Sequence, residues 1–231
     1  MDNYYAKHLH ATRLLLVYQT DIERVRQYLD AEIAFVRGHL TGSERVLELG
    51  AGYGRILREL APFAASLVGI DISEDSVALG EEYLRGVPNC ALRTMDAHHL
   101  DFQAEFDVVL GLQNGLSAMK GDPLHLVRES LRVLVPGGRA FFSSYSPQFW
   151  EHRLAWFFEQ AEKGLLGAID REKTRDGVIV CEDGFRATTF GAEDLERLAQ
   201  GVGCRYHIEE VDASSVFLVL EKGPESAHFG G

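Results

Sequence analysis

The sequence is poor in cysteine and proline and has no excess of positive charge. Its 231 residues include three cysteines and six prolines, and 23 lysines and arginines stand against 35 aspartates and glutamates, a net charge of −12 at pH 7. Cys90, Cys181 and Cys204 lie far apart and form no C-x-x-C pair, which argues against a disulfide framework and a structural zinc and fits a reducing cytoplasm. Because so acidic a chain gains little from counterion release, we expect no nucleic-acid partner.

Long hydrophobic runs are also missing. Residues 1–7 are polar rather than basic and then apolar, and the longest early apolar run covers only 14–17. This pattern predicts neither a signal peptide nor a membrane span, so we expect a cytoplasmic protein with no membrane partner. The composition, 46% hydrophobic and 25% charged, is that of an ordinary globular protein. We therefore expect one domain over residues 1–231 rather than two.

The middle of the chain alternates short apolar runs with helical periodicity. The apolar runs predict strands at 45–49, 67–70, 90–94, 106–110 and 139–145. The clearest helix between them begins at Asp122-Pro123 and is stopped by Pro136-Gly137-Gly138. This alternation predicts a parallel sheet with helices on both faces, in which ligands bind at the carboxyl ends of the strands.

The flanking segments extend this core. Residues 1–42 predict two helices, the first with Leu9 and Leu16 on one face and the second capped by Asp21. Residues 146–190 predict a helix and a β-hairpin insertion that turns at 182–184. Residues 191–222 predict a helix and an antiparallel strand pair, and 223–231 a loose tail.

A glycine-rich turn directly follows the first predicted strand. The sequence V-L-E-L-G-A-G-Y-G-R occupies 46–55, and the next helix begins there. Gly50, Gly52 and Gly54 let the backbone approach a ligand closely, and the amino end of the helix offers free N–H groups. The alternative is a tight strand-to-helix turn that binds nothing.

Each of the first three strands carries an acid at or near its end, namely Glu48, Asp71 and Asp96. A carboxylate at Asp71 can accept hydrogen bonds from two ribose hydroxyls, although an acid that stabilises a helix N-terminus is the alternative. The glycine loop contains no lysine. Three carboxylates favour a cationic ligand rich in hydrogen-bond donors, such as an ammonium, a ribose diol and an adenine amino group, over a phosphate.

The ordered motifs V-L-E-L-G-A-G-Y-G, G-I-D-I-S, M-D-A, F-D-V-V and L-V-P-G-G resemble those of the class I S-adenosylmethionine-dependent methyltransferases, over about 45–145. The resemblance implies an α/β, Rossmann-like fold with a seven-stranded, mostly parallel sheet whose last strand is antiparallel. It implies S-adenosyl-L-methionine as the methyl donor, S-adenosyl-L-homocysteine as its product, and residues 43–145 as the donor-binding core.

The resemblance also assigns residues by position. Glu48 and the glycine loop would hold the methionine part of the donor, Asp71 its ribose, and Asp96 the edge of its adenine. The full set of donor-binding residues that it implies is Glu48, Gly50, Ala51, Gly52, Gly54, Arg55, Asp71, Ile72, Asp96, Ala97 and Gln113.

Two other functions stay open. An NAD-type Rossmann oxidoreductase shares the glycine turn and the acid after the second strand. Here, however, Arg55 stands at the usual third glycine position, and Glu48 would repel a pyrophosphate. A non-catalytic nucleotide-binding module is the third possibility, and failure to bind the donor or to turn over would favour it.

Few residues in the sequence indicate which methyl acceptor the protein uses. The loop at 111–117 lacks the N-P-P-Y tetrapeptide of methyltransferases that act on nucleobase amines, which, with the acidic charge, favours a small molecule. Its L-Q-N-G stretch is similar to the L-G-N-S of glycine and sarcosine N-methyltransferases, and oxygen, carbon, thiol and metalloid acceptors stay open. Candidate substrate-side residues are Tyr5, Gln113, Asn114, Tyr145 and His152, of which Gln113, Asn114 and Tyr145 are the catalytic candidates.

The remaining segments predict the acceptor pocket. We expect it between the N-terminal segment around Tyr4 and Tyr5, the loop at 113–114, and the stretch from Tyr145 through the hairpin. Aromatic rings there could face the sulfonium of the donor. The rings are those of Tyr5, Tyr145, Phe149 and Trp150. No third ligand accompanies the pairs His8/His10 and His98/His99, so no metal site is expected.

Overall fold

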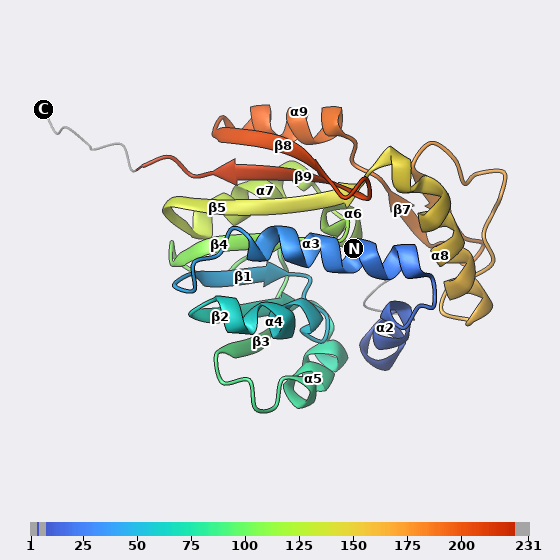
Figure 1. Cartoon of the computed structure of the whole chain (residues 1–231), viewed down its shortest axis with the longest axis horizontal. Coiled ribbons are helices and arrows are strands. Elements are labelled where there is room, and N and C mark those ends of the chain that lie inside the picture. The colour runs from blue at the N-terminus through green and yellow to red at the C-terminus, as the bar shows by residue number, and fades with distance from the viewer. Residues whose placement is uncertain (1–3, 5–7, 225–231) are drawn as a thin grey trace, which may run out of the picture.

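In a computed structural model of the chain, which describes Tyr4 and residues 8–224, seven strands form one sheet in the order β3-β2-β1-β4-β5-β9-β8 (Figure 1). The strands are β1 Arg45–Leu49, β2 Ser66–Asp71, β3 Cys90–Thr94, β4 Phe106–Gly111, β5 Leu134–Tyr145, β8 Arg205–Val211 and β9 Ser215–Glu221. The first five are parallel, and β9 pairs antiparallel with both β5 and β8. The Rossmann-like sheet with an antiparallel last strand is confirmed.

Helices cover both faces of the sheet because successive strand residues point to opposite sides. Val46 belongs to the apolar cluster of α3 Glu23–Arg37 and α4 Arg55–Leu60, in which Leu57 is fully buried. Its neighbour Leu47 belongs to the cluster of α7 Pro123–Val133 and α9 Ala192–Val202. The other short helices are η1 Ala61–Phe63, α5 Glu74–Tyr83, α6 Gly115–Ala118 and η2 Pro147–Phe149.

Helix α7 begins as predicted but ends earlier. The Asp122 side chain accepts a hydrogen bond from the N–H of Leu124 at 2.9 Å, and Pro123 occupies the first turn. The helix ends at Val133, and the predicted stop at 136–138 lies inside β5 instead. The reason is that these glycines pair with the chain after β9, where Gly137 donates to the carbonyl of Lys222 at 2.9 Å.

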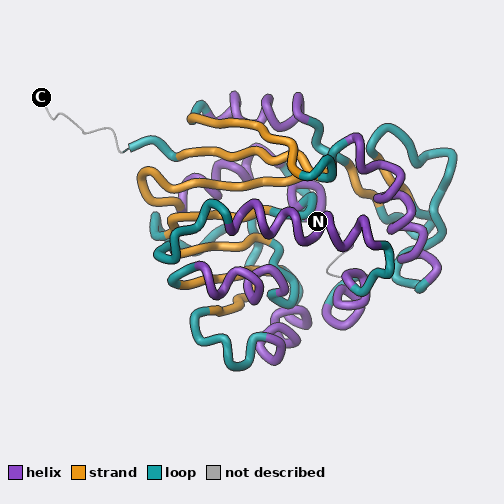
Figure 2. Tube along the Cα trace, in the orientation of Figure 1, coloured by secondary structure: helices purple, strands orange, loops and turns teal. Residues whose placement is uncertain are grey.

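A third apolar cluster lies beyond the carboxyl ends of the parallel strands. It joins α2 Ala11–Tyr18, α8 Trp150–Glu162 and the hairpin of β6 Val178–Val180 and β7 Arg186–Thr188. Figures 1 and 2 show α2 and α8 together at the right-hand end of the sheet. The predicted helix and hairpin insertion are confirmed, and Trp156 Nε1 fastens α8 to α2 by donating to the carbonyl of Val17 at 3.1 Å.

The N-terminal helices differ in detail from the prediction. Helix α3 begins at Glu23 with Ile22 at the N-cap, so the predicted Asp21 cap is wrong. Leu16 is 40% exposed, whereas Val17 is buried, because the packed face of α2 is the one that meets α8. Among the described residues, no helix combines the length and apolarity that crossing a membrane requires.

Candidate functional site

A cavity lies at the carboxyl ends of β1, β2 and β4 and is roofed by α2 and α8. Its empty space is about 1330 Å³ when the opening to solvent is included. All the residues that the resemblance places at the donor line this cavity except Gly54. Gly54 instead precedes α4 with a φ of 82°, and a Cβ there would come 2.9 Å from Leu84.

The glycine turn is tight and covered from above. Gly50 and Gly52 have φ values of 66° and 56°, in the left-handed region that favours glycine. A Cβ on Gly52 would come 2.5 Å from Leu14 of α2. The turn therefore presents bare backbone to the cavity, and α2 closes directly over it.

Asp71 lies at the end of β2 and braces this turn. Its carboxylate accepts one hydrogen bond from the N–H of Gly52 and another from the N–H of Ser73, both at 2.9 Å. Burial holds the pKa of Asp71 above its ordinary value, although both hydrogen bonds oppose the rise. Ser73 rather than Asp71 caps α5, by accepting from the N–H of Ser76 at 3.2 Å. Each Asp71 oxygen keeps a lone pair for a further donor.

Glu48 and Arg55 bring a carboxyl group and a guanidinium group into the cavity. Glu48 is 4% exposed, and its Oε2 has no hydrogen-bond partner among the described residues. Nε and Nη2 of Arg55 likewise have none there, and the guanidinium lies 4.5 Å from the centre of the Tyr18 ring. Burial raises the pKa of Glu48 to about 8, although Arg55 opposes the rise. The cavity therefore offers a carboxyl and a guanidinium that a zwitterionic ligand would satisfy.

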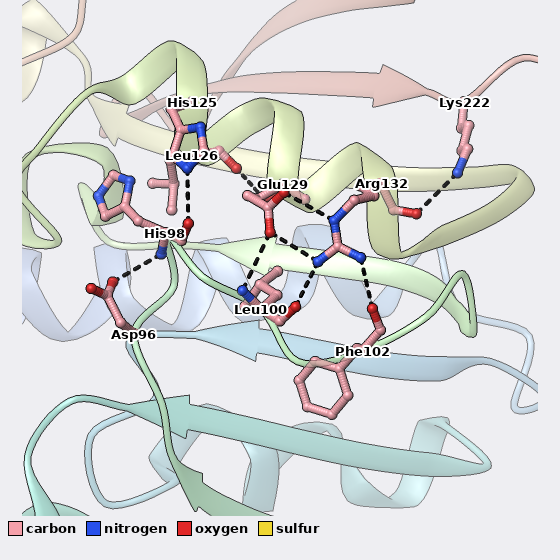
Figure 3. Close-up of polar contacts among 10 residues, drawn as sticks. Asp96, His98, Leu100, Phe102, His125, Leu126, Glu129, Arg132 and Lys222 are labelled. Carbon is pink, nitrogen blue, oxygen red and sulfur yellow. Dashed lines mark hydrogen bonds and ion pairs between the residues drawn. The ribbon is translucent and has the colours of Figure 1, made fainter.

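The loop after β3 carries Asp96 and Ala97 and is fastened to α7 (Figure 3). Asp96 accepts from the N–H of His98 at 2.9 Å, and the carbonyl of His98 contacts His125 Nε2 at 2.8 Å. Further along, Arg132 donates to the carbonyl of Leu100 at 2.6 Å. These contacts hold the edge of the cavity at a fixed place on α7.

Two of the predicted catalytic residues, Gln113 and Asn114, lie in the turn after β4, and their side chains take different positions. Gln113 and Asn114 have φ values of 53° and 62°, which are uncommon for residues with side chains. Gln113 lines the cavity, and its Nε2 is buried without a partner among the described residues. Asn114 does not line it, because its Oδ1 accepts from Ser144 Oγ at 2.8 Å. Asn114 therefore holds the turn, and Gln113 faces the ligand space.

Tyr145 lines the cavity as predicted, with the Arg153 guanidinium 4.3 Å from its ring centre. His152 does not: it is exposed, and its ring lies 5.7 Å from that of Phe149. Phe149 and Trp150 are also absent from the cavity wall. Tyr5 falls outside the described residues.

Sequence reasoning missed several lining residues because they depend on how helices pack. They are Leu9, Leu14, Val17 and Tyr18 from the α2 region and Trp156, Phe157 and Gln160 from α8. The hairpin turn does not reach the cavity; its Asp183 binds the Tyr4 hydroxyl instead. Of the expected rings, Tyr145 lines the cavity and Phe149 and Trp150 do not, and the other aromatic rings of the wall include Tyr18 of α2 and Trp156 and Phe157 of α8.

Glu32 was also missed. It is fully buried on α3, accepts from the N–H of Gln113 at 3.0 Å and from Ser215 Oγ at 2.6 Å, and stands beside Ile33 on the buried face of the helix. An acid within an apolar helical stripe was the available signal. No group of three or more potential metal ligands occurs in the part of the chain that the structure describes.

Comparisons with known proteins agree with the fold and the motifs. Residues 46–138 match the model of a methyltransferase domain family. A ubiquinone/menaquinone biosynthesis C-methyltransferase from Geobacter sulfurreducens is 34% identical over 112 residues, which cover 44% of this chain and 42% of that protein. A ubiquinone biosynthesis O-methyltransferase from Methylococcus capsulatus is 32% identical over 126 residues and 52% of each chain. The chain thus spans about half the length of these curated relatives.

The fold extends further than the sequence similarity. The PH0226 protein of Pyrococcus horikoshii superposes with a TM-score of 0.66 and 23% identity, covering 96% of this chain and 99% of that one. The structural similarity to this protein therefore extends over nearly the whole chain, beyond the part matched in sequence.

Proposed function

This chain belongs to the class I S-adenosylmethionine-dependent methyltransferases, and from that premise we propose that it transfers the methyl group of S-adenosylmethionine to a small-molecule acceptor. The donor supplies an electrophilic methyl group on a positively charged sulfur, so that transfer needs little beyond alignment and exclusion of water. The curated relatives are named for carbon and oxygen methylation in quinone biosynthesis, which supports a small acceptor.

The observation that carries this proposal is that Glu48 Oε2 and Nε and Nη2 of Arg55 are buried without hydrogen-bond partners among the described residues. The methionine part of the donor has an ammonium and a carboxylate, and each would satisfy one of these groups. A dinucleotide pyrophosphate offers no cation for Glu48 and would be repelled by its ionised form. The residues therefore fit the methyl donor and not NAD.

We infer the remaining donor contacts from the residues that line the cavity. Asp71 would accept from the ribose hydroxyls, Ile72, which is 46% exposed, would cover one adenine face, and Asp96 with Ala97 would meet the adenine edge. The chain Gly50–Ala51–Gly52 would approach the methionine backbone. Gln113 and Tyr145 would face the acceptor, with α2 and α8 excluding water. With a net charge of −12, we expect no nucleic-acid partner.

Calorimetry with S-adenosylmethionine, S-adenosylhomocysteine and NAD tests the proposal. We expect binding of the first two and little binding of NAD. Tight NAD binding without binding of the methyl donor would replace the proposal with an oxidoreductase, and binding of the donor without transfer to any acceptor would favour a non-catalytic module.

A further inference from the structure

The carboxyl group of Glu32 lies next to the turn that faces the methyl end of the donor site. The strands whose ends meet the cavity stand in the order β3-β2-β1-β4. Under the proposed function the donor occupies the ends of β3, β2 and β1, and the turn after the next strand, β4, faces its methyl group. Gln113 lines the cavity at this turn, and Glu32, which does not line it, accepts from the backbone N–H of Gln113 at 3.0 Å.

This turn depends on its hydrogen bonds. Gln113 and Asn114 both have left-handed φ values, 53° and 62°, which cost energy in residues with a Cβ. The N–H of Gln113 is shared between Glu32 and Ser143 Oγ, the latter at 2.8 Å, and the N–H of Asn114 donates to the carbonyl of Ser143 at 3.1 Å. The place of the Gln113 side chain in the cavity is therefore set by Glu32 and β5.

Holding the turn does not by itself require a charge at position 32. Glu32 is fully buried and accepts hydrogen bonds from neutral groups, namely Ser215 Oγ at 2.6 Å, the Ser143 hydroxyl and the N–H of Gln113. The carbonyl oxygen of a glutamine would accept from the same N–H. What only a carboxyl group adds is a buried negative charge when it ionises.

The groups around Glu32 leave this charge available. Burial raises the pKa of Glu32 to about 7, and Arg55 of α4 opposes the rise, so the carboxyl is partly ionised near neutral pH. Tyr28 on the same helix and Tyr145 of β5 stay neutral, because burial raises the pKa of each hydroxyl above its ordinary value. Arg153 of α8 lies against the Tyr145 ring, 4.3 Å from its centre. In the proposed complex the donor's carboxylate engages Arg55, and the donor brings its sulfonium as a new cation.

Resting on the proposed function, we propose that Glu32 is a positioning residue for methyl transfer, which acts through Gln113 and whose buried carboxylate favours the sulfonium donor over its neutral product. Transfer forms a bond between a lone pair of the acceptor and the methyl carbon, while the carbon–sulfur bond breaks and its electron pair stays on sulfur. The sulfur thereby loses its positive charge, and with it the attraction to Glu32. The same carboxylate thus tightens binding of the donor and leaves the product free to dissociate.

Calorimetry with S-adenosylmethionine and S-adenosylhomocysteine at pH 6 and pH 8 tests this on the parent and on Glu32→Gln. The two ligands differ only by the methyl group and its positive charge, so the ratio of their affinities isolates the sulfur. From pH 6 to pH 8 we expect this ratio to shift in favour of S-adenosylmethionine about fivefold more in the parent than in the variant. Titration of Glu48 and of the ligands' amino groups is common to both proteins and cancels in this comparison. The same pH profile in both proteins, or an equal loss of affinity for both ligands in the variant, would overturn the inference.

A second measurement uses the parent alone. At pH 7, binding of S-adenosylmethionine should release more protons than binding of S-adenosylhomocysteine, by up to about half a proton, because the sulfonium favours ionised Glu32. The release is read from the dependence of the binding enthalpy on the ionisation enthalpy of the buffer. Equal release with both ligands would also contradict the proposal.

Glu44→Gln is the matched control. Glu44 is another buried acid that accepts from backbone N–H groups, among them that of Gly42 at 3.1 Å, but it precedes β1 at the end of the strand opposite to the cavity. This variant should keep the pH profile of the parent, and loss of the profile here too would remove Glu32 as its source. Failure of both ligands to bind the parent would refute the proposed function instead, so the two failures are distinguishable.

Discussion

The carboxyl group of Glu32 on α3 accepts a hydrogen bond of 3.0 Å from the backbone N–H of Gln113, 81 residues later in the chain. Gln113 N–H also contacts Ser143 Oγ at 2.8 Å. A buried acid thus holds the left-handed turn that presents Gln113 to the cavity. Burial raises the pKa of Glu32 from 4.5 to about 7, although the hydrogen bonds from Ser215, Ser143 and Gln113 oppose the rise.

This raised pKa predicts how stability depends on pH. Between pH 4.5 and about 7 the folded protein binds a proton at Glu32 that the unfolded chain releases. The contribution of Glu32 to the free energy of unfolding is therefore complete below pH 4.5 and is lost as the pH rises through 7. The substitution Glu32→Gln removes this loss of stability, because glutamine does not ionise. Urea unfolding should show the variant more stable than the parent at pH 8, by up to about 3 kcal/mol, with the gap closing at pH 5. A variant that is less stable at pH 8 would mean that Glu32 is stabilising as a carboxylate.

The raised pKa of Glu48 predicts that the protein releases a proton when the donor binds. With a pKa of about 8 it is mostly protonated at pH 7 in the free protein, and an ammonium placed beside it favours the ionised form. Binding of S-adenosylhomocysteine at pH 7 should release up to about one proton, seen as a calorimetric enthalpy that varies with the ionisation enthalpy of the buffer. Glu48→Gln should abolish this variation. Buffer-independent enthalpy in the parent would place the ammonium elsewhere.

The substitution Arg55→Met distinguishes binding of the amino-acid part of the donor from binding of its nucleoside part. We expect it to weaken S-adenosylhomocysteine by about 2 kcal/mol, the scale of a charge-assisted hydrogen bond, while 5′-methylthioadenosine, which lacks the amino-acid part, changes little. The free protein should not lose stability, because two buried nitrogens that have no hydrogen-bond partner among the described residues are removed. Arg58→Met is the control: Arg58 is exposed on the same helix and stacks on Tyr83 at 4.7 Å. Equal losses for both ligands would contradict a role at the carboxylate.

Gly52→Ala tests the closure of α2 over the glycine turn. The new methyl group meets Leu14 at 2.5 Å in addition to the strain of a φ of 56°, so donor affinity should fall, by about tenfold or more. Adding Leu14→Ala should recover part of the affinity. The control Gly86→Ala carries the same kind of strain at a φ of 86° with nothing within 4 Å, and should lower stability by about 1 kcal/mol without changing donor binding. No recovery in the double variant would show that α2 does not close on Gly52.

Much of the core was readable from local patterns because each strand and helix is specified by its own residues. Apolar runs placed β1 and β3 to the residue, and Asp122-Pro123 marked the start of α7. The glycine turn and the acids after the strands could be read in the same way. Asp21 and Leu16 were misjudged because their roles depend on Glu159 and Trp156 of α8, which lie far along the chain.

The sequence by itself determined the order of strands and helices, the glycine turn and the carboxylates of the donor site, because periodicity and turn chemistry act over a few residues. Only the tertiary structure decided which side chains meet across the cavity. Packing of α2 and α8 brought Leu14 over Gly52 and Trp156 and Gln160 into the wall, and packing of α3 set Glu32 under Gln113. The same packing turned Asn114 to Ser144 and left His152 exposed. These contacts join segments more than a hundred residues apart in some cases, and burial in the folded state, not local pattern, selects them.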